Sequence, residues 1–411
     1  MKEKYAASQQ LIKETNLNLI FNLINKRGAV SRAELAQITR LSPTTVSSLT
    51  EELLQDKMIL ETGAGTTTTS GRKPIMLEVN PRGGIVASVE MLTDGFFLCL
   101  YDLKCREIEG KNCVVADYRR IGEEIVKDLD VIFKRRKLDE NKLLGICIGV
   151  PGLIDEETKR VISSTVIPIE EDNPFYSVIK SRFTGIPILM ENESGISAYA
   201  EREFGGTEDI QNLVYIDINA GVGSGIILGR EIFKGSFGMA GELGHVSIDM
   251  NGPRCRCGNR GCLETLAGIP AILQKIIAAV MLGENTVIKE LTGNDYNRIN
   301  LEVIRRALEA KDRLAMEVVA EAANKLAFGI NNIINFMNPG VIVIGGKITV
   351  LGDFYLTQVR KSLEEIALKP NVNKVEIKYS RIQGSAAALG GAKYVLDHIF
   401  RTNSLYGKYL I

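Results

Sequence analysis

The feature that most restricts the fold of this chain is a group of metal-type ligands within residues 241–264, which read GELGHVSIDMNGPRCRCGNRGCLE. Cys255, Cys257 and Cys262 form a C-x-C-x4-C array there, and His245 lies upstream of it. Three thiolates and one imidazole suit a closed tetrahedral zinc site. The alternative is three free thiols in a loop beside a hydrogen-bonded histidine, but the concentration of ligands favours zinc.

Composition indicates a protein of the reducing cytoplasm. The 411 residues suffice for two or three domains, at about 150 residues each. Lys+Arg and Asp+Glu both number 50, so any DNA contact must come from a local basic patch. Residues 1–16 are too polar for a signal peptide, and no apolar run reaches the ~20 residues that span a bilayer. We therefore expect a cytoplasmic protein with no membrane partner, and the 7 cysteines, an odd number, argue against a disulfide framework.

The N-terminal segment carries the signals of a helix-turn-helix. Apolar residues recur at helical spacing over residues 16–26. Ser31 and Glu34 form an S-x-x-E capping box that opens a second helix, which ends near residue 38. Ser42 is the predicted N-cap of a third helix, with Pro43 at its first position and an end near residue 57. The third helix is then the recognition helix.

Small hydroxyl side chains at the start of that helix can reach phosphates or base edges. The predicted DNA contacts there are Ser42, Thr44, Thr45, Ser47 and Ser48. Residues 58–61 and 75–79 predict two strands joined by a turn, which would form a wing. Arg72 and Lys73 on this wing are predicted to touch the DNA backbone or the minor groove. The alternative for the whole segment is a small helical protein-interaction domain, but the basic wing and the hydroxyl-rich helix start favour DNA.

The rest of the chain reads as a duplicated α/β body. A hairpin is predicted from residues 85–89 and 96–101, and a second from residues 213–218 and 225–228. Helical periodicity dominates residues 269–282, 301–308 and 313–336. Further strands end in glycine turns, at residues 145–150 and 341–344. This pattern predicts two lobes with a ligand cleft between them.

The polar residue types expected in that cleft suit a sugar, which presents adjacent hydroxyls. Carboxylates and amides form paired hydrogen bonds to adjacent hydroxyls. The candidates are Asn192, Glu193, Glu242, His245 and Glu264. A helix cap is the alternative for Asn192 and Glu193, and a solvated loop acid is the alternative for Glu242 and Glu264.

A glycine-rich turn can cradle phosphates through its backbone N–H groups, so an ATP site has to be considered. The second hairpin loop, residues 219–225, is open and glycine-rich. The first places Met91 and Leu92 where a close phosphate approach would need glycine.

The signature C-x-C-G-x-x-G-C-x-E at residues 255–264 and the element E-x-G-H within GELGH resemble those of the ROK family of repressors, open reading frames and sugar kinases. The resemblance covers about residues 85–399, and the winged helix makes the chain similar to the repressor branch, such as xylose-operon regulators. It implies an actin-like, hexokinase-type two-lobed fold. The implied zinc ligands are His245, Cys255, Cys257 and Cys262, and the implied sugar contacts are Gly152, Asn192, Glu193, Glu242, His245 and Glu264.

Two departures from the kinase members of that family bear on activity. Those members have D-x-G-G-T where this chain has residues 90–93, and Asn-Asp where it has Asn192-Glu193. In them the aspartate is the base that takes a proton from the sugar hydroxyl, and a misplaced base costs orders of magnitude in rate. We therefore expect sugar binding without phosphoryl transfer, and no catalytic residues.

The resulting hypothesis is a sugar-responsive repressor of carbohydrate-utilisation genes, acting on operator DNA as a homodimer or a dimer of dimers. The effector is expected to be xylose or another aldose, bound between the lobes. The alternatives are an active or bifunctional sugar kinase, and a repressor controlled by a protein of sugar transport. The expected domains are the winged helix over residues 1–79, a first lobe over 80–194 with the C-terminal helix 385–411, and a second lobe with the zinc loop over 195–384.

Overall fold

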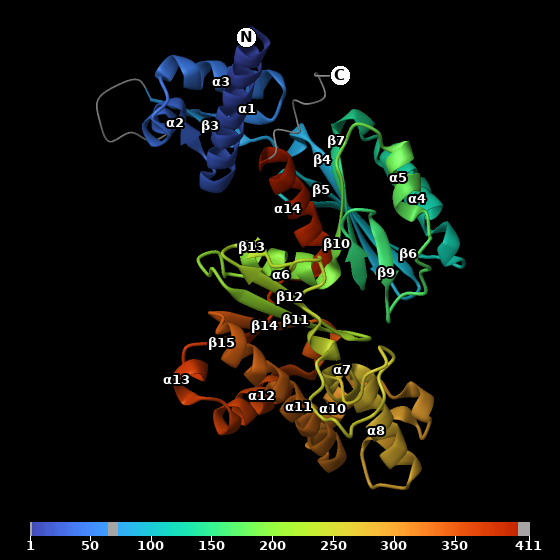
Figure 1. Cartoon of the computed structure of the whole chain (residues 1–411). Coiled ribbons are helices and arrows are strands. Elements are labelled where there is room, and N and C mark those ends of the chain that lie inside the picture. Colours follow the sequence, from blue (N-terminus) through green and yellow to red (C-terminus); the bar gives the residue numbers. More distant parts are fainter. Residues whose placement is uncertain (1, 65–72, 402–411) are drawn as a thin grey trace. The chain divides into compact units, whose positions relative to one another are not determined.

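The computed structural model describes residues 2–64 and 73–401 (Figure 1). Their contacts form two compact units. The first unit holds the described residues up to 149, residues 173–190, and those from 391 onward. The second holds residues 150–172 and 191–390. The division into three domains remains a prediction.

The N-terminal segment of the first unit is a winged helix. Its three-stranded sheet has the order β1-β3-β2. The elements are α1 (Lys2–Arg27), β1 (Val30–Ser31), α2 (Arg32–Thr39), α3 (Pro43–Gln55), β2 (Ile59–Ala64) and β3 (Ile75–Val79). The helix-turn-helix and both wing strands are therefore confirmed. Helix α1 begins well before the predicted residue 16, because no glycine or proline interrupts the sequence back to Lys2.

Local capping fixes the two helices of the helix-turn-helix motif. The Ser31 side chain accepts a hydrogen bond from Glu34 N at 3.2 Å, and Glu34 Oε2 accepts one from Ser31 N at 2.8 Å. Ser42 caps α3 by accepting from Thr45 N at 3.0 Å, with Pro43 at the first helical position. Both predicted caps are confirmed.

Replacing Ser31 with alanine is expected to cost about 1 kcal/mol of local stability, because one N-terminal amide loses its partner. The bond from the Ser31 backbone also lowers the pKa of Glu34. A carboxyl with a lowered folded pKa contributes stability above its unfolded pKa, and that contribution is lost as the pH falls through the folded value. Hydrogen exchange of the α2 amides should accelerate about fivefold in the variant at neutral pH. Unchanged exchange would mean that the capping box does not stabilise α2.

The first lobe is built on a five-stranded sheet of order β10-β7-β4-β5-β6. Strand β4 pairs antiparallel with β5 and parallel with β7. Helices α4 (Ile121–Arg136) and α5 (Phe175–Arg182) pack against each other beside it (Figure 1). The strands are β4 (Ile85–Leu92), β5 (Gly95–Asp102), β6 (Glu107–Val114), β7 (Leu143–Val150) and β10 (Ile188–Asn192).

The second unit repeats this plan. Its five-stranded sheet has the order β13-β12-β11-β14-β15, and β11 again pairs antiparallel with the next strand and parallel with a later one. The predicted duplication is thus confirmed. The strands are β11 (Leu213–Ile218), β12 (Val222–Leu228), β13 (Glu231–Ile232), β14 (Val341–Gly345) and β15 (Glu376–Tyr379), and a two-stranded sheet adds β8 (Leu153–Asp155) and β9 (Arg160–Ser163).

Helices complete the core of the second unit. The longest, α11, has a stripe of fully buried residues that includes Leu326 and Ile330. The helices are α6 (Glu193–Phe204), α7 (Leu263–Ala267), α8 (Ile269–Met281), α9 (Ile288–Thr292), α10 (Leu301–Glu309), α11 (Arg313–Met337), α12 (Gly352–Ile366) and α13 (Lys369–Val372), and α14 (Ala386–Arg401) runs from this unit into the first. No helix within residues 2–64 and 73–401 is both long and apolar enough to cross a membrane.

The prediction of an open loop over residues 219–225 is wrong. Strand β12 already begins at Val222, which pairs with Ile218, so only a short turn remains. Gly225 serves a packing role instead, because a Cβ built on it would lie 2.0 Å from Ser194 O of α6. The first hairpin is likewise tighter than predicted, with Met91 buried in β4 rather than placed in a loop.

Candidate metal centre and ligand site

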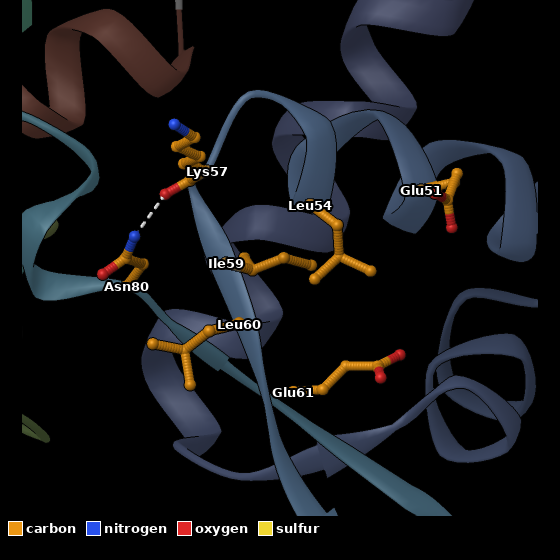
Figure 2. A pocket seen from close by; sticks show the side chains of 7 residues that line it. All are labelled: Glu51, Leu54, Lys57, Ile59, Leu60, Glu61 and Asn80. Carbon is orange, nitrogen blue, oxygen red and sulfur yellow. Dashed lines mark hydrogen bonds between the residues drawn. The ribbon is translucent and has the colours of Figure 1, made fainter.

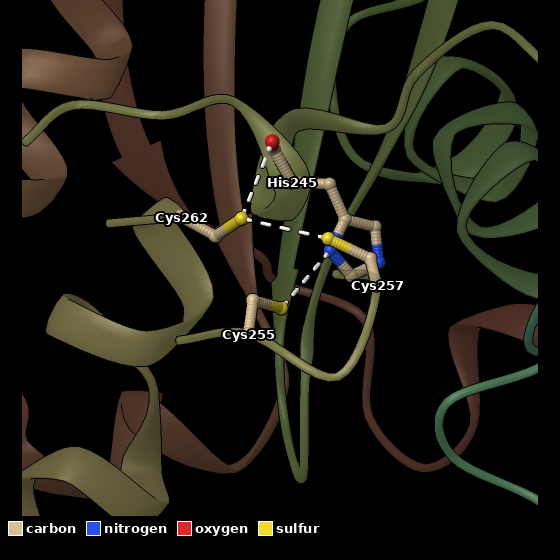
Figure 3. A group of neighbouring side chains, drawn as sticks. All are labelled: His245, Cys255, Cys257 and Cys262. Carbon is tan, nitrogen blue, oxygen red and sulfur yellow. Dashed lines mark hydrogen bonds between the residues drawn. The ribbon is translucent and has the colours of Figure 1, made fainter. Parts of the chain in front are cut away.

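Four predicted ligands converge in the second unit. The possible ligand atoms of His245, Cys255, Cys257 and Cys262 all lie within 4.8 Å of one another, and Figure 3 shows their side chains turned toward a common point. Cys257 Sγ is 3.7 Å from Cys262 Sγ, and Cys255 Sγ is 3.7 Å from His245 Nδ1. The four residues grouped by the sequence motif are thus also grouped in space.

The two separations of 3.7 Å match the spacing of ligand atoms around a tetrahedral zinc ion, and the limit of 4.8 Å for the whole group is wider than that spacing. Zinc–sulfur bonds of about 2.3 Å and zinc–nitrogen bonds of about 2.0 Å place neighbouring ligand atoms roughly 3.5–3.8 Å apart around a tetrahedron. Burial, together with the two neighbouring thiols, raises the pKa of Cys262 to about 12. A bound cation would reverse that effect, because coordination deprotonates a thiol.

Close backbone packing holds the metal loop, residues 245–262, in shape. A Cβ on Gly261, whose φ is +60°, would lie 1.7 Å from Asp249 O. A Cβ on Gly244 would lie 2.0 Å from Val222 O of β12. Only glycine permits both approaches, so the glycines of the two motifs serve the fold of the site.

His245 faces two ways. Its Nδ1 points toward the cysteines, and its Nε2 lies 3.9 Å from Glu242 Oε2 (Figure 3 shows the ring). Burial raises the pKa of Glu242, protonated His245 would lower it, and the charge of Glu264 raises it. A carboxylate beside the second ring nitrogen is the usual partner of a metal-bound histidine.

Glu264 is tied to the β11–β12 turn. Its Oε2 accepts from Val222 N at 3.1 Å, and a Cβ on Gly221 would come within 2.5 Å of the same oxygen. The side chain starts only two residues after Cys262, in the first turn of α7. Its placement therefore depends on the metal loop.

Asn192 is the N-cap of α6, as its helix-cap alternative predicted. Its Oδ1 accepts from Ser194 N and Gly195 N, and its Nδ2 donates to Gly152 O at 3.2 Å. The amide thus places Gly152, another predicted sugar contact, beside the start of α6. Glu193 follows as the first residue of α6, with Oε1 3.4 Å from Ser194 Oγ.

Sequence reasoning missed two connections beside this group. Lys234 pairs with Glu191, the residue before Asn192, and at 2.9 Å with Glu156. Ser164 organises a turn next to Gly152, because its Oγ accepts from Val166 N at 3.1 Å and donates to Pro151 O. The pair Ser163-Ser164 was the only sequence signal for this turn.

The predicted DNA contacts on α3 differ in the local hydrogen bonds that their hydroxyl groups make. Ser42 Oγ lies 2.7 Å from Thr44 Oγ1 and 2.8 Å from Thr45 Oγ1, so all three share a local hydroxyl cluster. Ser47 and Ser48 are exposed on α3.

Two basic residues of the winged helix are exposed candidates for DNA contact. Lys73 lies on the wing, just before β3, and Arg72 lies outside the described residues. Arg40 is exposed in the turn between α2 and α3, with a φ of +58°. It is not among the DNA contacts predicted from the sequence, although it lies only two residues before the predicted cap Ser42.

A pocket of about 490 Å³ also lies on the winged helix, between α3 and β2 (Figure 2). Glu51 and Glu61 line it together with Leu54. Asn80 Nδ2 donates to Lys57 O at 2.7 Å at its edge (Figure 2). None of the predicted DNA contacts within the described residues lines this pocket.

Comparison with known proteins agrees with these features. The model described as "ROK family" matches residues 87–398. The "Putative xylose repressor" of Caldicellulosiruptor sp. (strain Rt8B.4) is 32% identical over 401 residues, covering 94% of this chain and 96% of that protein. A solved ROK family transcriptional regulator, described as a homolog of the E. coli MLC protein, matches with a TM-score of 0.82 and 27% identity over 96% of this chain and 100% of that chain. A ROK family glucokinase from Streptomyces griseus, in complex with glucose and AMPPNP, matches with a TM-score of 0.67 and 21% identity. The match covers 76% of this chain and 99% of that chain, and at this identity it shows the fold alone.

Proposed function

This chain belongs to the ROK family, and we propose that it is a sugar-responsive transcriptional repressor of carbohydrate-utilisation genes. The observation that carries the proposal is the presence, in one chain, of a capped helix-turn-helix and of a polar site built on a cluster of one histidine and three cysteines. The relatives that match nearly its full length are named repressors. The chain would act on operator DNA in the cytoplasm.

The DNA half of the proposal rests on α3. Its exposed hydroxyls Ser47 and Ser48 would reach the major groove, and Arg40 and Lys73 would hold phosphates. A homodimer would place two such helices on successive major grooves of a near-palindromic operator, because two-fold symmetry in the protein is mirrored in the half-sites.

The sugar half rests on the group in the second unit. The carboxylates of Glu193, Glu242 and Glu264 would accept hydrogen bonds from the hydroxyls of a sugar. Asn192 would keep Gly152 in place through its hydrogen bond to the Gly152 carbonyl oxygen. A zinc ion held by the four cluster residues would fix the loop that carries His245 and Glu264. We take an aldose as the effector class and xylose as the first candidate, since relatives bear that name.

A sugar kinase is the second candidate, and the kinase-like fold is its support. Two contacts oppose it: the Val222 amide, which could bind a phosphate, already serves Glu264, and Gly225 is used for contact with α6. The resemblance to the kinase members implies that Glu193 takes the place of their aspartate. We therefore expect no sugar-dependent ADP release above background in a coupled assay with aldoses and amino sugars. Turnover that disappears in Glu193→Ala would favour the kinase instead.

A gel shift on the DNA upstream of the chain's own gene tests the proposed function. The protein alone should retard the fragment, and one sugar of a panel of pentoses, hexoses and amino sugars should change the retarded fraction. Absence of any retarded band without sugar would refute the DNA-binding half. Retardation that no sugar alters would favour control by a protein partner.

A further inference from the structure

The turn that Ser164 organises, residues 164–167, lies beside the candidate sugar residues, and we call it the strap. Ser164 Oγ accepts from Val166 N and Ile167 N, both at 3.1 Å, and donates to Pro151 O. Pro151 is followed by Gly152, whose carbonyl oxygen accepts a hydrogen bond from Asn192 Nδ2. One end of the strap is therefore anchored to the start of α6 through short, local contacts.

The other end of the strap is held by the metal loop. Arg256 Nη1 donates to Thr165 O at 3.2 Å across 91 residues of sequence. Arg256 stands between Cys255 and Cys257, so a metal ion held by the cluster would fix the backbone on both sides of it. Its guanidinium is a rigid planar donor on a long side chain, which suits it to reach a carbonyl on a neighbouring loop.

The strap and Glu264 both lie beside the β11–β12 turn. A Cβ built on Gly221 would lie 3.7 Å from Val166 Cγ2 of the strap and 2.5 Å from Glu264 Oε2. Glu264 continues the metal loop through α7 and accepts from Val222 N. Val166 of the strap and Glu264, two residues after the metal loop, thus both lie at this turn. Arg256 joins the strap to the metal loop directly.

We propose that Arg256 is a positioning residue that clasps the strap to the metal loop, so that the bound metal sets the shape of the sugar site through this arginine. This inference rests on the proposed sugar-binding function. Without the clasp, the strap loses its hydrogen bond to the metal loop and keeps its Ser164 contacts and the buried Ile167. Thr165 and Val166 are then held less firmly beside the turn that Glu264 contacts. Sugar affinity then falls although every predicted sugar contact is still present.

The test compares Arg256→Ala with Arg254→Ala, measuring sugar affinity and metal content together. Arg254 is also exposed on the same loop, and among the described residues its side chain makes no hydrogen bond to the strap. We expect Arg256→Ala to keep one metal per chain and to bind sugar about tenfold more weakly, the loss typical of one hydrogen bond to a charged group. Arg254→Ala should bind as the wild type does. Arg256→Lys should fall between them, because a lysine keeps the charge without the planar fork.

Chelation supplies the decisive comparison. If the metal acts through Arg256, stripping it weakens sugar binding in the wild type, and Arg256→Ala then adds little to that loss. Hydrogen exchange at Val166 and Ile167 should accelerate in the metal-loaded Arg256→Ala protein and in the stripped wild type alike.

Three outcomes would overturn the clasp: the same tenfold loss in Arg254→Ala, an Arg256→Ala effect as large without metal as with it, or unchanged exchange of the strap amides. Should the wild type bind no sugar at all, the sugar half of the proposed function fails. The exchange measurements decide on the clasp even then.

Discussion

Replacing Cys257 with serine is expected to abolish stable metal binding and to weaken sugar binding by roughly 10-fold to 100-fold. The thiolate is one of four ligands, and a serine hydroxyl is a poor substitute for a soft sulfur donor. Cys257 is exposed, unlike Cys255 and Cys262, so its loss leaves no cavity. Metal per chain measured by elemental analysis and sugar affinity measured by calorimetry should fall together.

Cys105→Ser is the matched control, because Cys105 belongs to the first unit and is not one of the four cluster residues. It should keep both the metal and sugar affinity. Cys257→Ser protein that lacks metal and still binds sugar like the wild type would show that the metal has no part in recognition. In that case the dependence of Glu264 and the strap on the metal loop would be wrong as well.

Replacing Ser48 with glutamate is expected to reduce operator affinity by about a hundredfold, because a dimer would bring two new carboxylates toward the phosphates. A loss of about 1.4 kcal/mol at each half-site is tenfold, and the two multiply. Ser48 is exposed on α3, so the change should not disturb the fold. Fluorescence anisotropy with a labelled operator duplex measures the effect.

Gln55→Glu makes the same charge change at the far end of the same helix, where the side chain is also exposed. The start of a recognition helix, rather than its end, enters the groove, so this control should lose much less affinity. Equal losses in the two variants would mean that net charge, and not the position on α3, accounts for the effect. Sugar binding should be unchanged in both.

The parts of the structure that the sequence predicted are those set by local hydrogen bonds or by ligand chemistry. The caps Ser31 and Ser42 act within three or four residues, so their partners can be read directly. The cluster cysteines lie within eight residues of one another, and only His245 had to be added from nearby. The duplicated hairpins followed from strand patterns that each lobe repeats.

The features that the sequence could not predict depend on contacts between segments that are far apart in the sequence. The glycine-rich sequence predicts Gly225 as part of an open loop, but its role follows from α6 lying against β12. The sequence predicts Asn192 as a sugar contact or a helix cap; the structure shows the cap, and adds a hydrogen bond to Gly152 O that no sequence pattern indicates. The hydrogen bond from Arg256 to Thr165 O joins residues 91 positions apart. Its acceptor is a backbone carbonyl, which every residue type has, so the sequence at position 165 does not indicate it.

Whether the sugar is a signal coupled to DNA binding is tested most directly by a thermodynamic cycle. Sugar affinity is measured with and without saturating operator duplex, and operator affinity with and without saturating sugar. Because coupling is reciprocal, we expect both affinities to change by one common factor, which is typically about 5-fold to 150-fold. A sugar that binds the free and the DNA-bound protein with the same affinity would contradict the proposed role of the sugar as a signal.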